Sequence, residues 1–347
     1  MYILKNVILI YVLLIYIFFI DIILMSTIEK RIKLYNHFVD ILKHSDKHLP
    51  KSKILGRGGQ GKVFESCSNK KCLAVKKIYI NWKLSEFFKD QFNPDALKDG
   101  IYIELLAGHL INQLILQGIS PHFALNYAWD YKERERASVC SDTYPYTMYH
   151  YNEIIQNTIT YTKWIQEIHS LKEWYNAYFQ ITVSIYVLQT FFNMTHFDLH
   201  SENILVQKVK KGGYFEYIID GVSYKLPNLG FRLYIIDLGQ AFIPKKFKSW
   251  YVKQEYSNRR LTKAFDIQFL FESTLELSTS PKEFKNEISQ LIKDIDIKEH
   301  FASIIYDLWY NKYETVKENS KLIETYNLDK KLNTTDIPKD IKHLVIN

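Results

Sequence analysis

Cysteine is scarce in this chain of 347 residues, which contains only Cys67, Cys72 and Cys140. Their positions do not form the paired spacing of a zinc site, and three cysteines are too few for a disulfide framework. We therefore expect Cys67 and Cys72 to be ordinary strand residues in a protein from a reducing compartment. The sequence also lacks internal repeats, low-complexity linkers and motifs for sequence-specific nucleic-acid binding. These absences argue against a disulfide-rich scaffold, a repeat protein and a nucleic-acid partner.

Apolar residues, by contrast, are abundant. Hydrophobic residues make up 47% of the chain and aromatic residues 15%, which is the composition of a folded protein with room for two lobes and a large core. The net charge of +7 is modest. Its basic clusters are either solvated loops or a docking surface for an acidic substrate or partner. The clusters are Lys208 with Lys210 and Lys211, Lys245 with Lys246 and Lys248, and Arg259 with Arg260 and Lys263.

The N-terminus carries an unbroken apolar run from Val7 to Ile20, which Asp21 interrupts before three further apolar residues. A membrane-spanning helix needs about 20 apolar residues, so this run is short for one. Two interpretations stay open. Residues 7–24 anchor the protein in a membrane, with the basic residues at 30–33 on the cytoplasmic side, or Met25 is the true start and residues 1–24 are a translated extension.

The most informative segment is His196-Phe197-Asp198-Leu199-His200-Ser201-Glu202-Asn203. It places an aspartate and an asparagine five positions apart, behind a histidine, as in the catalytic loop of a phosphotransferase. In such a loop the aspartate accepts the proton of the attacking hydroxyl, and the asparagine holds a magnesium ion. For His196 we favour a packed ring that hydrogen-bonds backbone near the metal site over a role as acid or base.

A glycine-rich segment lies upstream, with Gly56, Gly58 and Gly61 followed by Val63. Glycine is needed where the backbone approaches a phosphate closely. A dinucleotide-binding turn shares this spacing but should lead into a helix. Here residues 62–67 alternate like a strand, and a second strand is predicted over residues 72–79. A glycine-rich hairpin over phosphates is therefore favoured.

The second of these strands contains Lys76, which would contact the α- and β-phosphates of ATP. Such a lysine needs an acidic partner on a helix. Apolar residues at helical spacing predict a helix over residues 101–117, with Asp99 as its N-cap. Glu104 is the acid within that helix. It is either the partner of Lys76 or a residue that only complements the helix dipole.

Two aspartates compete for the second metal position. Asp220 has the better spacing from Asn203, whereas Asp237 begins an Asp-Leu-Gly sequence. Asp220-Gly221 lies between two alternating runs, which is a strong signal for a two-residue hairpin turn. We therefore choose Asp237 and predict that residues 208–232 form an inserted hairpin.

Taken together, these motifs resemble the eukaryotic-type protein kinase superfamily over roughly residues 51–277. The Asp-Leu-His form of the loop and the inserted hairpin are similar to haspin-like kinases and to serine/threonine kinases of large DNA viruses. The resemblance implies an α+β, two-lobed protein-kinase fold that transfers the γ-phosphate of ATP to serine or threonine hydroxyls of proteins, with Mg²⁺. It implies catalytic roles for Asp198, Lys76 and Glu104, ATP contacts from Gly56, Gly58, Gly61, Val63 and Lys76, and metal ligation by Asn203 and Asp237.

The sequence departs from that superfamily in its activation segment. Phe197 stands where many kinases have the arginine that contacts a phosphorylated activation loop, and no Ala-Pro-Glu follows Gly239. Activation by loop phosphorylation is therefore not expected. Asp266, in an apolar helical run, is expected to brace the catalytic loop as the superfamily's buried aspartate does.

The domain prediction follows from these assignments. Residues 1–24 form the hydrophobic segment, 25–48 a helical leader, 49–150 the N-lobe and 151–347 the C-lobe with its insert at 208–232. Two other functions stay open, a small-molecule hydroxyl kinase of the choline or aminoglycoside type and a pseudokinase scaffold. The composition, rich in isoleucine, lysine, asparagine and tyrosine, is compatible with a viral source. The expected location is the cytoplasmic side of a host cell or the virion.

Overall fold

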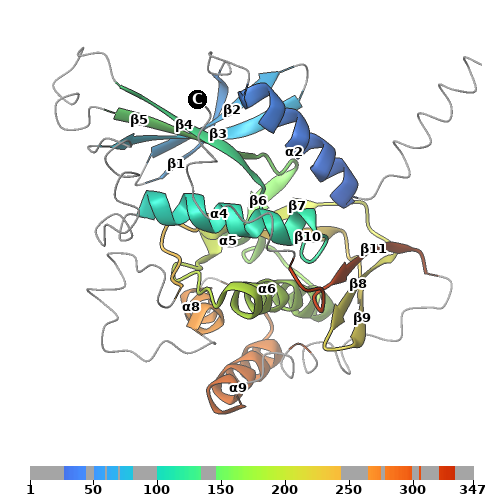
Figure 1. The fold of residues 1–347 in the computed structure, drawn as a ribbon. Helices are drawn as coiled ribbons and strands as arrows, with labels where there is room; N and C mark the ends of the chain where they lie inside the picture. Colours follow the sequence, from blue (N-terminus) through green and yellow to red (C-terminus); the bar gives the residue numbers. More distant parts are fainter. Residues whose placement is uncertain are drawn as a thin grey trace, which may run out of the picture.

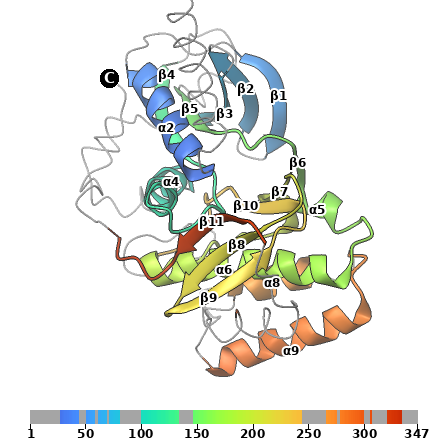
Figure 2. The same cartoon turned by 90° about the vertical axis from the view of Figure 1, so that its right-hand side faces the viewer.

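The computed structural model describes residues 27–43, 51–58, 61–68, 71–80, 100–133, 146–243, 265–274, 278–298, 305 and 320–332. These residues form two lobes, with a β-sheet lobe above a mainly helical one (Figures 1 and 2). The α+β, two-lobed architecture predicted from the sequence is confirmed.

The N-lobe is built on a five-stranded antiparallel sheet in the order β1-β2-β3-β5-β4. Its strands are β1 (Lys51–Gly58), β2 (Gly61–Ser68), β3 (Lys71–Ile80), β4 (Asn126–Glu133) and β5 (Tyr146–Glu153). The glycine segment closes the β1–β2 hairpin, where Gly58 pairs with Gly61. A Cβ atom at Gly61 would collide with the backbone oxygen of Lys77 on β3, so only glycine fits there.

Two helices cover this sheet. Helix α4 (Gly100–Leu116) lies between the sheet and the C-lobe, and helix α2 (Thr27–Lys43) crosses α4 and β4 (Figure 1). Phe38 of α2 is fully buried and packs against the ring of Tyr127 from β4. Apolar residues on nearly every side of α4 are buried, as expected for a helix enclosed by other elements.

The C-lobe is organised around helix α6 (Leu171–Phe192), with α8 (Phe265–Thr274) and α9 (Lys282–Lys298) packed against it. Ser170 and Glu173 form a capping box at the start of α6, and Asn193 in the left-handed conformation ends it. A short sheet of β6 (Thr158–Thr160), β7 (Ile204–Lys208) and β10 (Phe231–Ile235) presents the catalytic loop. Short elements α5 (Tyr161–Trp164) and η3 (Ser201–Asn203) complete this region.

The hairpin predicted between β7 and β10 is present as β8 (Tyr214–Ile219) and β9 (Val222–Pro227). Asp220 and Gly221 form its turn, and both have positive φ angles, as a primed two-residue turn requires. A strand that we did not predict, β11 (Leu322–Asn327), pairs in parallel with β8. The pairing joins the C-terminal part of the chain to the insert (Figure 2).

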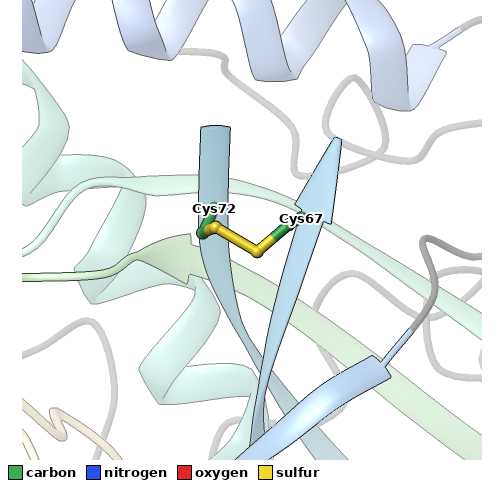
Figure 3. The surroundings of a disulfide bond; sticks show 2 residues. All are labelled: Cys67 and Cys72. Atoms are coloured by element: carbon green, nitrogen blue, oxygen red, sulfur yellow. A yellow bond between two sulfur atoms is a disulfide. The ribbon is translucent and has the colours of Figure 1, made fainter. Parts of the chain in front are cut away.

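Our expectation for the cysteines was wrong. Cys67 and Cys72 are opposite each other on β2 and β3 and form a disulfide (Figure 3). Cross-strand neighbours have closely spaced side chains, so the hairpin register brings the two sulfur atoms together. The number of cysteines did not reveal this, because the pairing depends on register.

Several sequence predictions lie outside the described residues. They are the apolar run at 7–20, the Asp99 cap, and the basic clusters at 245–248 and 259–263. Within the described part of the chain, no helix is long and apolar enough to cross a membrane.

Candidate active site

Lys76 and Glu104 form the buried part of the site. Lys76 lies on β3 and Glu104 on α4, and Nζ of the lysine is 2.7 Å from Oε2 of the glutamate. The alternation of β3 places Val75 in the core and turns Lys76 toward α4. Glu104 lies in the second turn of α4, on the side that faces β3. Of the two roles that the sequence left open for Glu104, the structure therefore shows the pairing with Lys76.

The charges of this pair stabilise each other. Burial acts to raise the pKa of Glu104, but the Lys76 ammonium and the His150 ring both act to lower it, and together they bring the pKa down to about 2. Burial acts to lower the pKa of Lys76, and the carboxylates of Glu104 and Asp237 reverse this and raise it. Both groups are therefore charged at neutral pH. Lys76 can bind a phosphate without a change in the protonation state of either group.

Asp237 reaches the same lysine from the C-lobe. Its Oδ1 atom lies 3.4 Å from Nζ of Lys76, although the two residues are 161 positions apart. Asp220 lies instead in the β8–β9 turn, where its carboxylate accepts a hydrogen bond from Tyr186. The structure therefore brings Asp237 into the site and leaves Asp220 in the hairpin turn.

Two backbone contacts hold the segment before Asp237. Ile236 donates its N–H to the carbonyl oxygen of Asn203 at 3.0 Å. The carbonyl of Ile236 accepts a hydrogen bond from Nε2 of His196, also at 3.0 Å. His196 is fully buried, so this ring links the catalytic loop to the strand end that carries Asp237, as we expected for a packed histidine.

Asp266 of α8 holds the start of the catalytic loop through hydrogen bonds to its backbone. Its buried carboxylate accepts backbone hydrogen bonds from His196 at 2.8 Å and Phe197 at 2.9 Å. Phe197 has a φ of 71°, an unfavourable region for a side chain of this size. The two hydrogen bonds help to hold this conformation, and Phe197 itself stacks on Phe265 beside Asp266.

Asp198 and Asn203 occupy the rim of the site. The side-chain amide of Asn203 donates to the backbone oxygen of Asp198 at 2.9 Å, which leaves its amide oxygen as the atom able to ligate a metal. The side chains of Asp198 and Asp237 are 41% and 43% exposed. Partial burial raises the pKa of Asp198 and the charge of Asp237 raises it further, while His200 and His196 act to lower it.

These residues fit a divalent cation with a nucleotide. The Asp237 carboxylate acts, after burial, to raise the pKa of Asp198, so the two carboxylates repel each other, and both are partly open to solvent. A divalent cation would relieve that repulsion, and carboxylate and amide oxygens are the ligands that magnesium prefers. Val63 is the register partner of Lys76, so the glycine hairpin lies beside the lysine, as phosphate binding requires.

The two lobes and this convergence of lysine, glutamate and aspartates define a protein of the kinase class. The profile of the family described as "Haspin like kinase domain" matches residues 24–255. The chain belongs to this family. The match includes α2, the N-lobe and the catalytic loop.

One curated relative is the probable serine/threonine-protein kinase 380R of Invertebrate iridescent virus 6. It is 25% identical over 208 residues, which cover 56% of this chain and 37% of the relative. The match thus spans little more than a third of the relative's length. Together with the family match, this relative supports the classification of the chain as a protein kinase.

One further residue of the site, His150, lies on β5, opposite Lys76 of β3. Neither a motif nor a spacing in the sequence points to it. Only the pairing of β3 with β5 shows that its ring faces Glu104.

Proposed function

We propose that this protein is an ATP- and magnesium-dependent protein kinase that phosphorylates serine and threonine hydroxyls. The observation that carries the proposal is the position of Nζ of Lys76 between Glu104 at 2.7 Å and Asp237 at 3.4 Å. A cation held between a buried anion and a solvent-exposed one is placed to bind a phosphate. The family membership and the viral relative support the same activity.

The residues would divide the reaction as follows. Lys76, oriented by Glu104, holds the α- and β-phosphates, and Asp198 orients the substrate hydroxyl and accepts its proton. The bond from the hydroxyl oxygen to the γ-phosphorus forms as the bond to the β–γ bridging oxygen breaks, and ADP leaves. Asn203 and Asp237 would hold magnesium, which neutralises charge on the phosphates. The protein's contribution is mainly positioning and electrostatics.

The alternative of a small-molecule hydroxyl kinase is disfavoured by the full glycine motif of Gly56, Gly58 and Gly61, because such enzymes usually lack so full a version. A pseudokinase scaffold is disfavoured because every residue type needed for transfer is present. We further propose that the enzyme acts on the cytoplasmic side of a host cell or in a virion. This proposal rests on its need for ATP and on the viral relative.

Incorporation of labelled phosphate from ATP tests the function. The full chain is incubated with labelled ATP and Mg²⁺, and with casein, histone or choline as acceptor. We expect labelled serine or threonine in a protein acceptor. The variant Asp198→Ala should retain ATP binding and lose about 10²–10⁴ in rate, the typical effect of removing a general base. Undiminished transfer by Asp198→Ala would refute the mechanism, and labelling of choline alone would favour the small-molecule alternative.

A further inference from the structure

Glu104 meets a second side chain besides Lys76. His150 of β5 is the register partner of Lys76 of β3, so both side chains are on the same face of the sheet, toward α4. Nδ1 of His150 lies 3.5 Å from Oε1 of Glu104, while Lys76 contacts Oε2. Each oxygen of the carboxylate therefore faces a different group.

The other ring nitrogen of His150 determines which proton the ring can offer. Nε2 makes a short contact with the side-chain nitrogen of Asn126 on β4. With the Asn126 amide in this orientation its nitrogen donates to Nε2, and the ring then carries its proton on Nδ1. The N–H on Nδ1 is the group that faces Glu104.

This N–H is buried, and Glu104 is the acceptor nearest to it. The His150 side chain is 3% exposed. Among the residues that the structure describes, Nδ1 has no hydrogen bond of standard geometry. A buried donor without a partner is destabilising. Oε1 of Glu104, 3.5 Å away, is the acceptor that faces this N–H.

Asn126 fixes His150 relative to helix α4. The side chain of Asn112 on α4 bonds the backbone of Asn126 twice, to its oxygen at 2.6 Å and from its nitrogen at 2.9 Å. Gly108 lets α4 approach at this point, because a Cβ atom there would lie 2.8 Å from the Asn126 side chain. The helix that carries Glu104 and the strand pair that carries His150 are thus held at a set distance.

We propose that His150 is a positioning residue for the Lys76–Glu104 ion pair. Its Nδ1–H holds Oε1 of Glu104, so that the carboxylate keeps its orientation when Lys76 turns from Asp237 to the phosphates of the nucleotide. This inference adds a residue role to the proposed kinase activity, and it rests on that proposal. It predicts a function for a buried histidine of β5 whose contacts are with Glu104 and Asn126.

Steady-state kinetics of three variants of the full chain test this role. His150→Phe keeps the ring volume and removes the donor, and we expect KM for ATP to rise about tenfold with a smaller change in kcat. His150→Asn places an amide N–H near the position of Nδ1 and should restore KM to within about threefold of wild type. His150→Gln carries its amide further out, near Nε2, and should not restore KM.

His122→Phe is the matched control. His122 is also fully buried, and its ring contacts the Leu233 oxygen and the Tyr217 hydroxyl, each at 2.9 Å. Its replacement should lower thermal stability without raising KM for ATP. Equal KM values for wild type and His150→Phe, or equal values for the Asn and Gln variants, would overturn the proposal.

Hydrogen exchange separates this inference from the proposed function. Without nucleotide, His150→Phe should speed amide exchange in α4 around Glu104, whereas His150→Asn and His122→Phe should not. If the wild-type protein transfers no phosphate, the kinase proposal fails, and the exchange result alone decides whether His150 positions Glu104. Unchanged exchange in His150→Phe would refute that role. If His150→Phe does not fold, the KM values for ATP of His150→Asn and His150→Gln decide instead whether an N–H near the position of Nδ1 is needed.

Discussion

Arg31 and Glu153 form a buried ion pair between helix α2 and the end of strand β5, with 2.6 Å between Nη2 and Oε2. Nη1 of Arg31 also donates to the Pro121 oxygen at 2.9 Å, and Nη2 contacts the Phe123 oxygen. Glu153 in turn accepts from the backbone of Leu125 at 3.0 Å. Arg31 therefore ties α2 to the loop before β4 and to the strand that ends between the lobes.

We expect Arg31→Met to lower the free energy of unfolding by about 3–5 kcal/mol, because it leaves the Glu153 carboxylate buried and unpaired. Urea denaturation followed by tryptophan fluorescence measures this change. Lys30→Met is the control, since Lys30 is exposed on the same helix and should change stability by no more than about 0.5 kcal/mol. Similar values for the two variants would show that the ion pair does not hold α2.

Asp237→Ala should lower the rate of phosphate transfer by about 10² or more, because it removes a charge that stabilises the reacting phosphates. Asp220→Ala should leave the rate within about twofold, since Asp220 lies in the β8–β9 turn. Both variants remove an aspartate with a positive φ, so the comparison controls for backbone strain. The measurement is the magnesium-dependent transfer of labelled phosphate. A slow Asp220→Ala with a normal Asp237→Ala would reverse the metal assignment.

The stability contributed by Glu104 should depend on pH. Its pKa is about 2 in the folded protein, below the ordinary value of 4.5. A lowered carboxyl pKa stabilises the fold at pH above the unfolded value, and this contribution is lost as the pH falls through the folded value. The advantage of wild type over Glu104→Gln should therefore be greatest above about pH 4.5 and shrink toward about pH 2.

Urea denaturation across a pH series measures that advantage. The control is Glu202→Gln, which changes an exposed glutamate and should shift stability little at any pH. A difference between wild type and Glu104→Gln that does not change with pH would contradict the assignment of a charged, buried Glu104.

Reduction of the Cys67–Cys72 disulfide should lower stability by about 2 kcal/mol, the loop-entropy value for so short a loop. Thermal unfolding with and without a phosphine reductant measures the effect. The double variant Cys67→Ser/Cys72→Ser should no longer respond to the reductant. Identical unfolding of oxidised and reduced wild type would show that the bond contributes nothing to stability.

Local elements were predictable because local rules govern them. The alternation in β2 and β3, the helical spacing in α4 and the Asp220-Gly221 turn each depend on a few neighbouring residues. Those predictions agree with the structure to within a few residues. The strand β11 was not predictable in this way, since its partner β8 lies about a hundred positions earlier and a parallel pairing leaves no turn signal between the strands.

The sequence alone determined which chemical groups this protein carries and the order in which they occur, including Lys76, Glu104, Asp198, Asn203 and Asp237. Only the tertiary structure decided that Asp237 reaches Lys76 while Asp220 does not. It alone also showed that Cys67 meets Cys72 and that His150 faces Glu104. The physical reason is that strands, helices and turns depend on a few neighbouring residues. These contacts depend instead on strand register and on the packing of one lobe against the other.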